Sequence, residues 1–295
     1  MFLLQQNTCF IMLHSGKTIY TRYNKQVLER IMVRWVLLVW LTLSALLSAQ
    51  QTLAAPLNVL VGQNKPPYIR LETVSGYEIE LLREVVRRMG HEAVFVFVPN
   101  SRIRGLLESG NGDIATLQPN EPDEPGLFFS QPYIRYQNVA VSRAQDEFTL
   151  QHPADLAAKR VIAFQGATKV LGPDYRDTMA QNPAYQEMVD QRAQVDMLLY
   201  GRTQVVVLDR NIFTFHMQNA AEPVEVSIHP LFGSTLYRAA FRDPVLQRSF
   251  DKALLSVLLD NWYQQLQLTY FLQVNQQLPN RFYCPEQAAA PSNSL

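Results

Sequence analysis

Apolar residues recur at helical spacing in the segment 76–90. Ile79, Leu82 and Val86 follow one another at intervals of three or four residues, which places them on one face of a helix. Acidic residues lie at the start of the segment and arginines near its end, an order that suits the helix dipole, and Gly90 provides a C-terminal stop. The pattern therefore predicts an amphipathic helix here.

Mainly apolar runs of strand length alternate with helical patterns along the rest of the chain, and the run at 94–98 is continuous. Such runs are typical of buried strands in parallel sheets with helices on both faces. The predicted strands are 57–61, 94–98, 114–117, 138–142, 161–164 and 205–209, and the predicted helical segments are 102–109, 185–200 and 245–271. Ligands bind beyond the carboxyl ends of parallel strands. We therefore expect one site, lined by the loops after Val61, Leu117, Phe164 and Leu208.

A short apolar run precedes the first predicted strand. Met32 and Arg34 lead into an apolar stretch over 35–49, and small residues follow at 54–55. A basic flank, an apolar core and a small-residue exit are typical of a secretory signal peptide. The run is shorter than the roughly 20 residues that span a membrane. We expect residues 1–55 to be a leader with its true start at Met32, and the mature protein to be periplasmic; a retained anchor is the alternative.

Composition narrows the class of protein. With 47% hydrophobic and 18% charged residues, the chain can bury a large core. Without its leader it is mildly acidic and has no basic cluster, which argues against a nucleic-acid partner. Cys9 and Cys284 offer neither a disulfide framework nor metal-ligand spacing. No histidine is paired with Ser, Asp or Cys at a suggestive spacing, so we expect no metal, no cofactor and no enzyme activity.

Five short motifs follow one another in a recognisable order. They are Gly-Tyr-Glu-Ile-Glu-Leu at 76–81, Leu-Glu-Ser-Gly-Asn-Gly-Asp-Ile at 107–114, Phe-Ser-Gln-Pro-Tyr at 129–133, and the segments 156–168 and 201–209. This order resembles family 3 of the periplasmic solute-binding proteins, most of which serve amino-acid ABC transporters. In the last motif Gln204 replaces an acid. The resemblance covers nearly all of residues 57–275.

The resemblance implies an α/β, two-lobed periplasmic-binding-protein-like (type II) fold with two hinge crossings and an interlobe cleft. We expect lobe 1 to comprise residues 56–143 plus 232–285, lobe 2 to comprise 144–231, and 286–295 to form a flexible tail, with the first crossing after Arg143. The lobes of such a protein close on a ligand that contacts both of them. The expected function is capture of a small amine-bearing solute for an ABC transporter by a monomer. A ligand-sensing subunit of a membrane receptor and a periplasmic dehydratase-like enzyme are the alternatives.

The resemblance also assigns ligand-binding roles. Asp209 matches the acid that holds a ligand ammonium, and Thr168 matches a hydroxyl that, with nearby backbone N–H groups, receives a carboxylate. For each of them a helix cap is the alternative. Tyr68 follows two prolines and is expected to project into the cleft, with packing under its loop as the alternative. Gln118 and Asn120 are plausible amide contacts at a strand exit.

One family feature is missing. Amino-acid binders of this family carry an arginine six residues before the phenylalanine of the motif that matches Phe-Ser-Gln-Pro-Tyr at 129–133, and this arginine binds the ligand carboxylate. The matching residue here is Asp123, and an acid cannot replace a bidentate guanidinium. Either Arg102 supplies the charge from a neighbouring loop, or the solute lacks an α-carboxylate and is cationic, such as a polyamine or an amine-bearing osmolyte. For Arg102 the alternative is a solvated arginine on a helix face.

Overall fold

The computed structural model describes residues 32–36, 55–119, 125–220, 222 and 224–272. The chain divides into two compact units, Met1–Leu53 and Ala54–Leu295. Of the first unit only a short helix over 32–36 is described, so the predicted leader lies almost wholly outside the described residues, as do Asn120 and the predicted tail. Every helix within the described ranges is too short or too polar to span a bilayer.

The second unit is built on a mixed sheet in the order β2-β1-β3-β10-β5-β8-β6-β7, with β4 paired to β10 and β9 paired to β5. The two ends of this sheet are parallel, and its middle is antiparallel. The strands are β1 (Leu57–Val61), β2 (Ala93–Phe97), β3 (Ile114–Pro119), β4 (Phe128–Phe129), β5 (Ile134–Arg143), β6 (Val161–Phe164), β7 (Tyr185–Met188), β8 (Val205–Asp209), β9 (Val226–His229) and β10 (Ser234–Phe241). The apolar runs of the sequence thus form the predicted α/β architecture.

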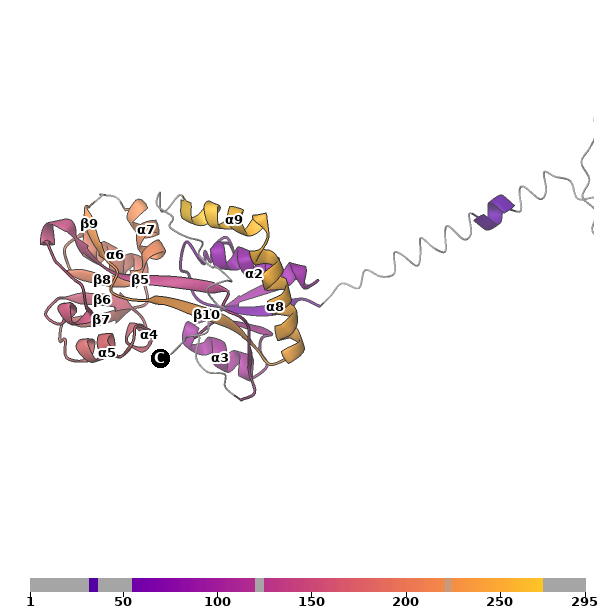
Figure 1. The fold of residues 1–295 in the computed structure, drawn as a ribbon, viewed down its shortest axis with the longest axis horizontal. Helices are drawn as coiled ribbons and strands as arrows, with labels where there is room; N and C mark the ends of the chain where they lie inside the picture. Colours follow the sequence, from indigo (N-terminus) through magenta and orange to yellow (C-terminus); the bar gives the residue numbers. More distant parts are fainter. Residues whose placement is uncertain (1–31, 37–54, 120–124, 221, 223, 273–295) are drawn as a thin grey trace, which may run out of the picture. The chain divides into compact units, whose positions relative to one another are not determined.

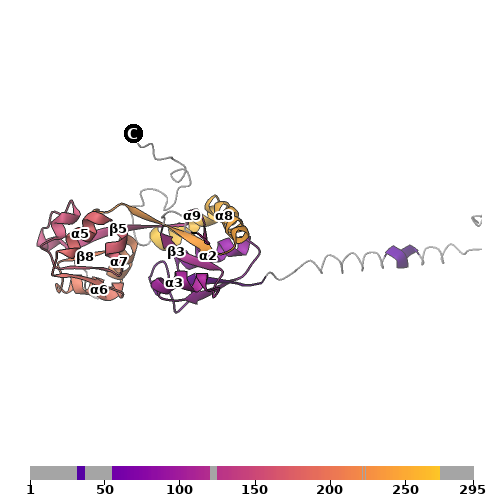
Figure 2. The ribbon, with the colours of Figure 1, turned by 90° about the horizontal axis from the view of Figure 1, so that it is seen from below.

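Strand β5 belongs to both halves of this sheet. Its residues 134–137 pair with β10, and its residues 138–142 pair with β8. The change of partner divides the fold into two lobes, and Figures 1 and 2 show β5 and β10 running between them. From this pairing we propose that the first crossing lies within β5, between Gln137 and Asn138, rather than after Arg143. The chain returns to lobe 1 through β10, which pairs with β3.

Lobe 1 carries the helix that the sequence predicted first. It is α2 (Tyr77–Arg88), and its residues Ile79, Leu82 and Val86 are buried. Gly90 has a φ of 85°, the left-handed conformation that ends a helix and that glycine adopts without strain. The other helices of this lobe are α3 (Asn100–Glu108), α8 (Pro244–Leu258), α9 (Asn261–Gln267) and a π-helical turn over Leu268–Leu272.

Three predicted elements differ from the structure. Strand β2 lies at the edge of the sheet, so Val94 is exposed and its other residues are only partly buried, instead of being covered on both faces. The segment 185–200 begins as strand β7 before it becomes helical. The predicted helix 245–271 is broken because Asp260 caps α9 and accepts a hydrogen bond from the Trp262 amide.

Lobe 2 presents three parallel strand ends to lobe 1. Strands β7, β6 and β8 are parallel neighbours, so their carboxyl ends lie at one edge of the sheet. Strand β8 is wholly buried, and the side chain of Gln194 donates to the carbonyls of Ile162 and Val207. The helices are α4 (Ala167–Val170), α5 (Pro173–Ala180), α6 (Gln191–Leu199) and α7 (Arg210–Gln218), with 3-10 turns at Ala144–Asp146 and Pro153–Leu156.

Candidate functional site

The two lobes meet at the carboxylate of Asp209. This residue ends β8 and caps α7, so Oδ1 accepts hydrogen bonds from the amides of Asn211 at 2.9 Å and Ile212 at 3.2 Å. Oδ1 also accepts from the Tyr68 hydroxyl of lobe 1 at 3.1 Å, and Oδ2 accepts from the Gln137 amide at 2.9 Å. The capping role that the sequence left open is therefore present, together with a contact between lobes.

Tyr68 combines packing with this polar contact. Its ring is fully buried and lies 4.5 Å from the ring of Tyr136, 5.7 Å from that of Phe271 and 6.2 Å from that of Tyr77, measured between centroids. Its hydroxyl also accepts a hydrogen bond from Nδ2 of Asn211 at 2.8 Å. The ring is held firmly against lobe 1, and the hydroxyl reaches lobe 2.

A buried carboxylate and a lysine lie beside this contact. Glu78 is fully buried and accepts hydrogen bonds from the hydroxyls of Tyr133 at 2.6 Å and Tyr136 at 3.5 Å. The ammonium of Lys65 lies 5.0 Å from the centroid of the Tyr136 ring. Glu78 precedes Leu82 by one helical turn, so it lies on the apolar face of α2 as well as in its first turn, and this spacing is the sequence signal for its burial.

Burial changes the acidity of all three charged groups. It lowers the pKa of Lys65, against the raising effect of the Glu78 and Asp209 carboxylates. It raises the pKa of Glu78, although Lys65 and the two tyrosine hydroxyls oppose this. It raises the pKa of Asp209 to about 6, although four hydrogen bonds to its carboxylate oppose the rise. A nearby cation would therefore stabilise the ionised form of both carboxylates at the junction of the lobes.

Thr168 belongs to a second hydrogen-bonded cluster, which is centred on the carboxylate of Glu187. Its amide and its hydroxyl donate to Oε1 of Glu187, at 3.1 Å and 3.0 Å, and the Gly166 amide donates to Oε2 of the same carboxylate at 2.7 Å. The hydroxyl of Tyr185 adds a bond of 2.9 Å. The donors that we expected to receive a ligand carboxylate are therefore bonded to a carboxylate of the protein. Neither Glu187 nor Lys65 was singled out from the sequence.

The remaining predicted residues do not join the contact between Tyr68 and Asp209. Gln118 is buried, and its side chain donates to the Thr116 carbonyl at 2.8 Å. Arg102 is exposed near the start of α3. Asn120 lies outside the described residues. The structure thus brings together two of the six residues.

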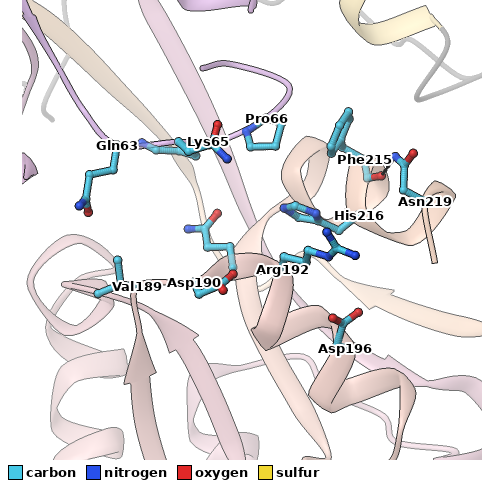
Figure 3. A pocket seen from close by; sticks show the side chains of 12 residues that line it. Gln63, Lys65, Pro66, Val189, Asp190, Arg192, Asp196, Phe215, His216 and Asn219 are labelled. Atoms are coloured by element: carbon cyan, nitrogen blue, oxygen red, sulfur yellow. Dashed lines mark hydrogen bonds between the residues drawn. The ribbon is translucent and has the colours of Figure 1, made fainter. Parts of the chain in front are cut away.

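A cavity of about 730 Å³ lies between the β1–α2 loop of lobe 1 and helices α6 and α7 of lobe 2. Figure 3 shows Gln63, Lys65 and Pro66 on one side of it and Asp190, Arg192 and His216 on the other. The full lining comprises Gln63, Asn64, Lys65, Pro66, Val189, Asp190, Gln191, Arg192, Asp196, Phe215, His216 and Asn219. Both lobes line this space, so a molecule inside it would contact both.

The cavity is polar and carries charges of both signs. Burial lowers the pKa of His216, as does Arg192, although Asp190 and Asp196 raise it. The His216 imidazole is therefore neutral at neutral pH. Within the described part of the chain, no group of three or more His, Cys, Asp or Glu side chains is arranged to hold a metal ion. The polar and charged side chains that line the cavity can hold a solute by hydrogen bonds and by electrostatic attraction.

Comparison with known sequences finds related proteins. Residues 57–273 match the family described as bacterial extracellular solute-binding proteins, family 3. The chain is 27% identical over 162 residues to the probable ABC transporter extracellular-binding protein YckB of Bacillus subtilis (strain 168). The match covers 54% of this chain and 55% of that protein, so the chain spans about half the length of this curated relative.

Solved structures share the fold. An ancestral arginine-binding protein bound to arginine superposes with a TM-score of 0.62 at 19% identity, over 74% of this chain and 99% of that one. The GluR0 ligand-binding core in complex with L-glutamate superposes with a TM-score of 0.61 at 17% identity, over 74% of this chain and 98% of that one. These similarities show that the chain has the two-lobed fold of type II periplasmic binding proteins.

Proposed function

Because the chain belongs to the bacterial extracellular solute-binding proteins, family 3, we propose that it captures a small amine-bearing solute between its lobes for an ABC transporter. Family membership makes it an extracytoplasmic solute-binding protein. We propose the periplasm as the compartment, with the leader removed. Amino acids and related amines are the proposed solute class, since the two proteins of similar fold are bound to arginine and L-glutamate. Capture requires differential binding alone, so the proposal assigns the protein no catalytic step.

The observation that carries the proposal is the hydrogen bond between Tyr68 and Asp209. It joins the two lobes at the carboxyl end of β8. Separation of the lobes breaks this bond and exposes a carboxylate that burial had made less acidic. An ammonium group forms a stronger, charge-assisted hydrogen bond with a carboxylate than a phenol does. An amine is therefore suited to bind Asp209 in the open state and to be enclosed when the lobes close.

The interlobe cavity supports the same proposal. Its lining from lobe 1 includes Lys65, which interacts electrostatically with Asp209 and Glu78. Its lining from lobe 2 includes the amide side chains of Gln191 and Asn219. A solute in this space would contact both lobes, which is the condition for a ligand to stabilise the closed state over the open one.

A thermal-shift screen of the purified protein against amino acids, polyamines and organic acids tests the proposal. A solute at a hundred times its Kd adds about 2.7 kcal/mol of stability, which raises the Tm by roughly 5–10 °C in a domain of this size. We expect such shifts from amine-bearing solutes and none from organic acids without an amine. Shifts confined to the organic acids would refute the amine assignment.

Two matched variants place the amine. Asp209→Asn keeps a side chain that caps helices as well as aspartate does but removes the negative charge, so we expect the shift to disappear. Asp243→Asn is the control, because Asp243 caps α8 in the same way, and no residue of α8 lines the cavity, whereas Asp209 caps α7, which does line it. Its shift should equal that of the wild type. An unchanged shift in folded Asp209→Asn would remove Asp209 from the binding site.

The transport role needs a separate measurement. Uptake of the radiolabelled solute by cells should fall when the gene is deleted, and neighbouring permease and ATPase genes would support the assignment. A neighbouring histidine kinase or cyclase gene, with uptake unchanged, would favour a sensing subunit.

A further inference from the structure

Glu187 occupies the donors at the entrance to α4. Its carboxylate accepts hydrogen bonds from the amides of Gly166 and Thr168 and from the hydroxyls of Thr168 and Tyr185, at 2.7 to 3.1 Å. Gly166 has a φ of 85°. In that conformation successive amides turn toward one point and form a concave anion-binding surface. The protein thus fills its own anion-binding surface.

The Glu187 carboxylate is firmly ionised. Partial burial raises its pKa, but the hydrogen bonds from Gly166, Thr168 and Tyr185 outweigh burial and leave the pKa below its ordinary value. A solute carboxylate could reach these donors only by displacing an ionised group that already saturates them. If it bound next to Glu187 instead, it would meet a like charge.

This group lies at the edge of lobe 2 that faces the cavity. Glu187 is in β7 and is in register with Ala163 of β6. Since β6, β7 and β8 are parallel, the donors after β6 lie at the same sheet edge as Asp209, which ends β8. The residues that follow β7, Val189 and Asp190, line the cavity itself. Glu187 therefore stands close to the space that a solute would enter.

The charges around this space favour a cation. The carboxylates that line the cavity or lie in the two adjoining groups outnumber the cations there. The carboxylates are those of Glu78, Glu187, Asp190, Asp196 and Asp209, and the cations are Lys65 and Arg192. Arg192 is exposed, and Asp190 and Asp196 share its surroundings. A cationic solute would be attracted by this field, whereas a zwitterion would bring a carboxylate into it.

We propose that the solute is a cationic amine without a carboxylate, and that Glu187 is the residue that excludes the corresponding amino acid. This inference rests on the proposed function, since it names the solute class for the same cavity.

Calorimetric titration of the purified protein with matched pairs tests this inference. Agmatine is arginine without its carboxylate, and cadaverine is lysine without its carboxylate, so each pair differs in one group. We expect at least one amine to bind ten times or more tightly than its amino acid. Tighter binding of arginine and lysine would overturn the inference and leave the proposed function intact. Absence of binding by all four compounds, together with no amine among the hits of the thermal-shift screen, would overturn both.

Variants of Glu187 test its role directly. Glu187→Ala removes the acceptor from these donors, so the affinity for the amino acid should rise. The ratio between the Kd of the amino acid and the Kd of the matching amine should therefore fall. Glu187→Gln keeps a hydrogen-bond acceptor in place if the alanine variant fails to fold, and it should narrow the preference to a smaller extent. Asp177→Asn is the control, because it removes a charge from an exposed ion pair of the same lobe. An unchanged preference in a folded Glu187 variant would overturn the role of this residue.

Discussion

The unusual acidity of Asp209 makes a prediction about stability and pH. Burial raises the pKa of this carboxyl from its ordinary 3.8 to about 6, so between these two values the folded protein binds more protons than the unfolded chain. Stability therefore falls as the pH rises through this range. One pKa unit corresponds to about 1.4 kcal/mol, so Asp209 should reduce the free energy of unfolding by about 3 kcal/mol between pH 3.5 and pH 7.

The variant Asp209→Asn isolates this effect. Asparagine caps helices as well as aspartate does, but it does not titrate. Urea denaturation followed by circular dichroism, at pH values from 3.5 to 7, gives the free energy of unfolding of both proteins. The wild-type value minus the variant value should fall by about 3 kcal/mol over this range. Titrating groups that do not interact with Asp209 affect both proteins equally and cancel in the difference.

Asp260→Asn is a control with the opposite sign. Asp260 also caps a helix, but its pKa is lowered by the hydrogen bond from the Trp262 amide and by Arg88. Here the wild-type value minus the variant value should rise with pH. A difference that stays flat or rises for Asp209→Asn would show that the carboxylate is not destabilised by burial, and the account of the junction between the lobes would be wrong.

Two further changes test the packing of the lobes, each by urea denaturation at neutral pH. Phe250→Ala should lower the free energy of unfolding by about 3–5 kcal/mol, because removal of this fully buried ring leaves a cavity. Leu255→Ala on the same helix, where the side chain is 51% exposed, should change the free energy of unfolding by no more than about 0.5 kcal/mol. Equal effects of the two variants would contradict the assignment of the buried face of α8. Gln194→Ala should lower the free energy of unfolding by about 1–3 kcal/mol, since it leaves the buried carbonyls of Ile162 and Val207 without this donor. A decrease below about 0.5 kcal/mol would mean that these hydrogen bonds contribute little to stability.

Much of the fold follows from local pattern. The mainly apolar runs at 57–61, 161–164 and 205–209 form β1, β6 and β8 with the predicted bounds, because short apolar runs of this length suit the buried strands of a parallel sheet. The same reasoning was wrong in predicting that β2 is buried on both faces, since a local pattern does not reveal which strand lies at a sheet edge. It also predicted one helix where Asp260 separates α8 from α9, because the helical spacing of apolar residues continues on both sides of this cap.

The candidate site was less accessible from sequence. Tyr68 and Asp209 were both predicted, but their contact joins residues 141 positions apart, and no local pattern specifies it. Glu187 was missed because its partners are backbone amides of a neighbouring strand exit, which become visible only once β6 and β7 are in register. Lys65 was missed for a similar reason: its neighbours Glu78 and Asp209 come from different lobes.

The central claim is that two lobes close on an amine held by Asp209. A crystal structure of the protein with agmatine tests it most directly. The account predicts that residues of both lobes contact the solute, that an amine nitrogen lies within about 3.2 Å of the Asp209 carboxylate, and that Glu187 keeps its bonds to Gly166 and Thr168. Agmatine bound to one lobe alone, or bound between the lobes with no amine near Asp209, would contradict it.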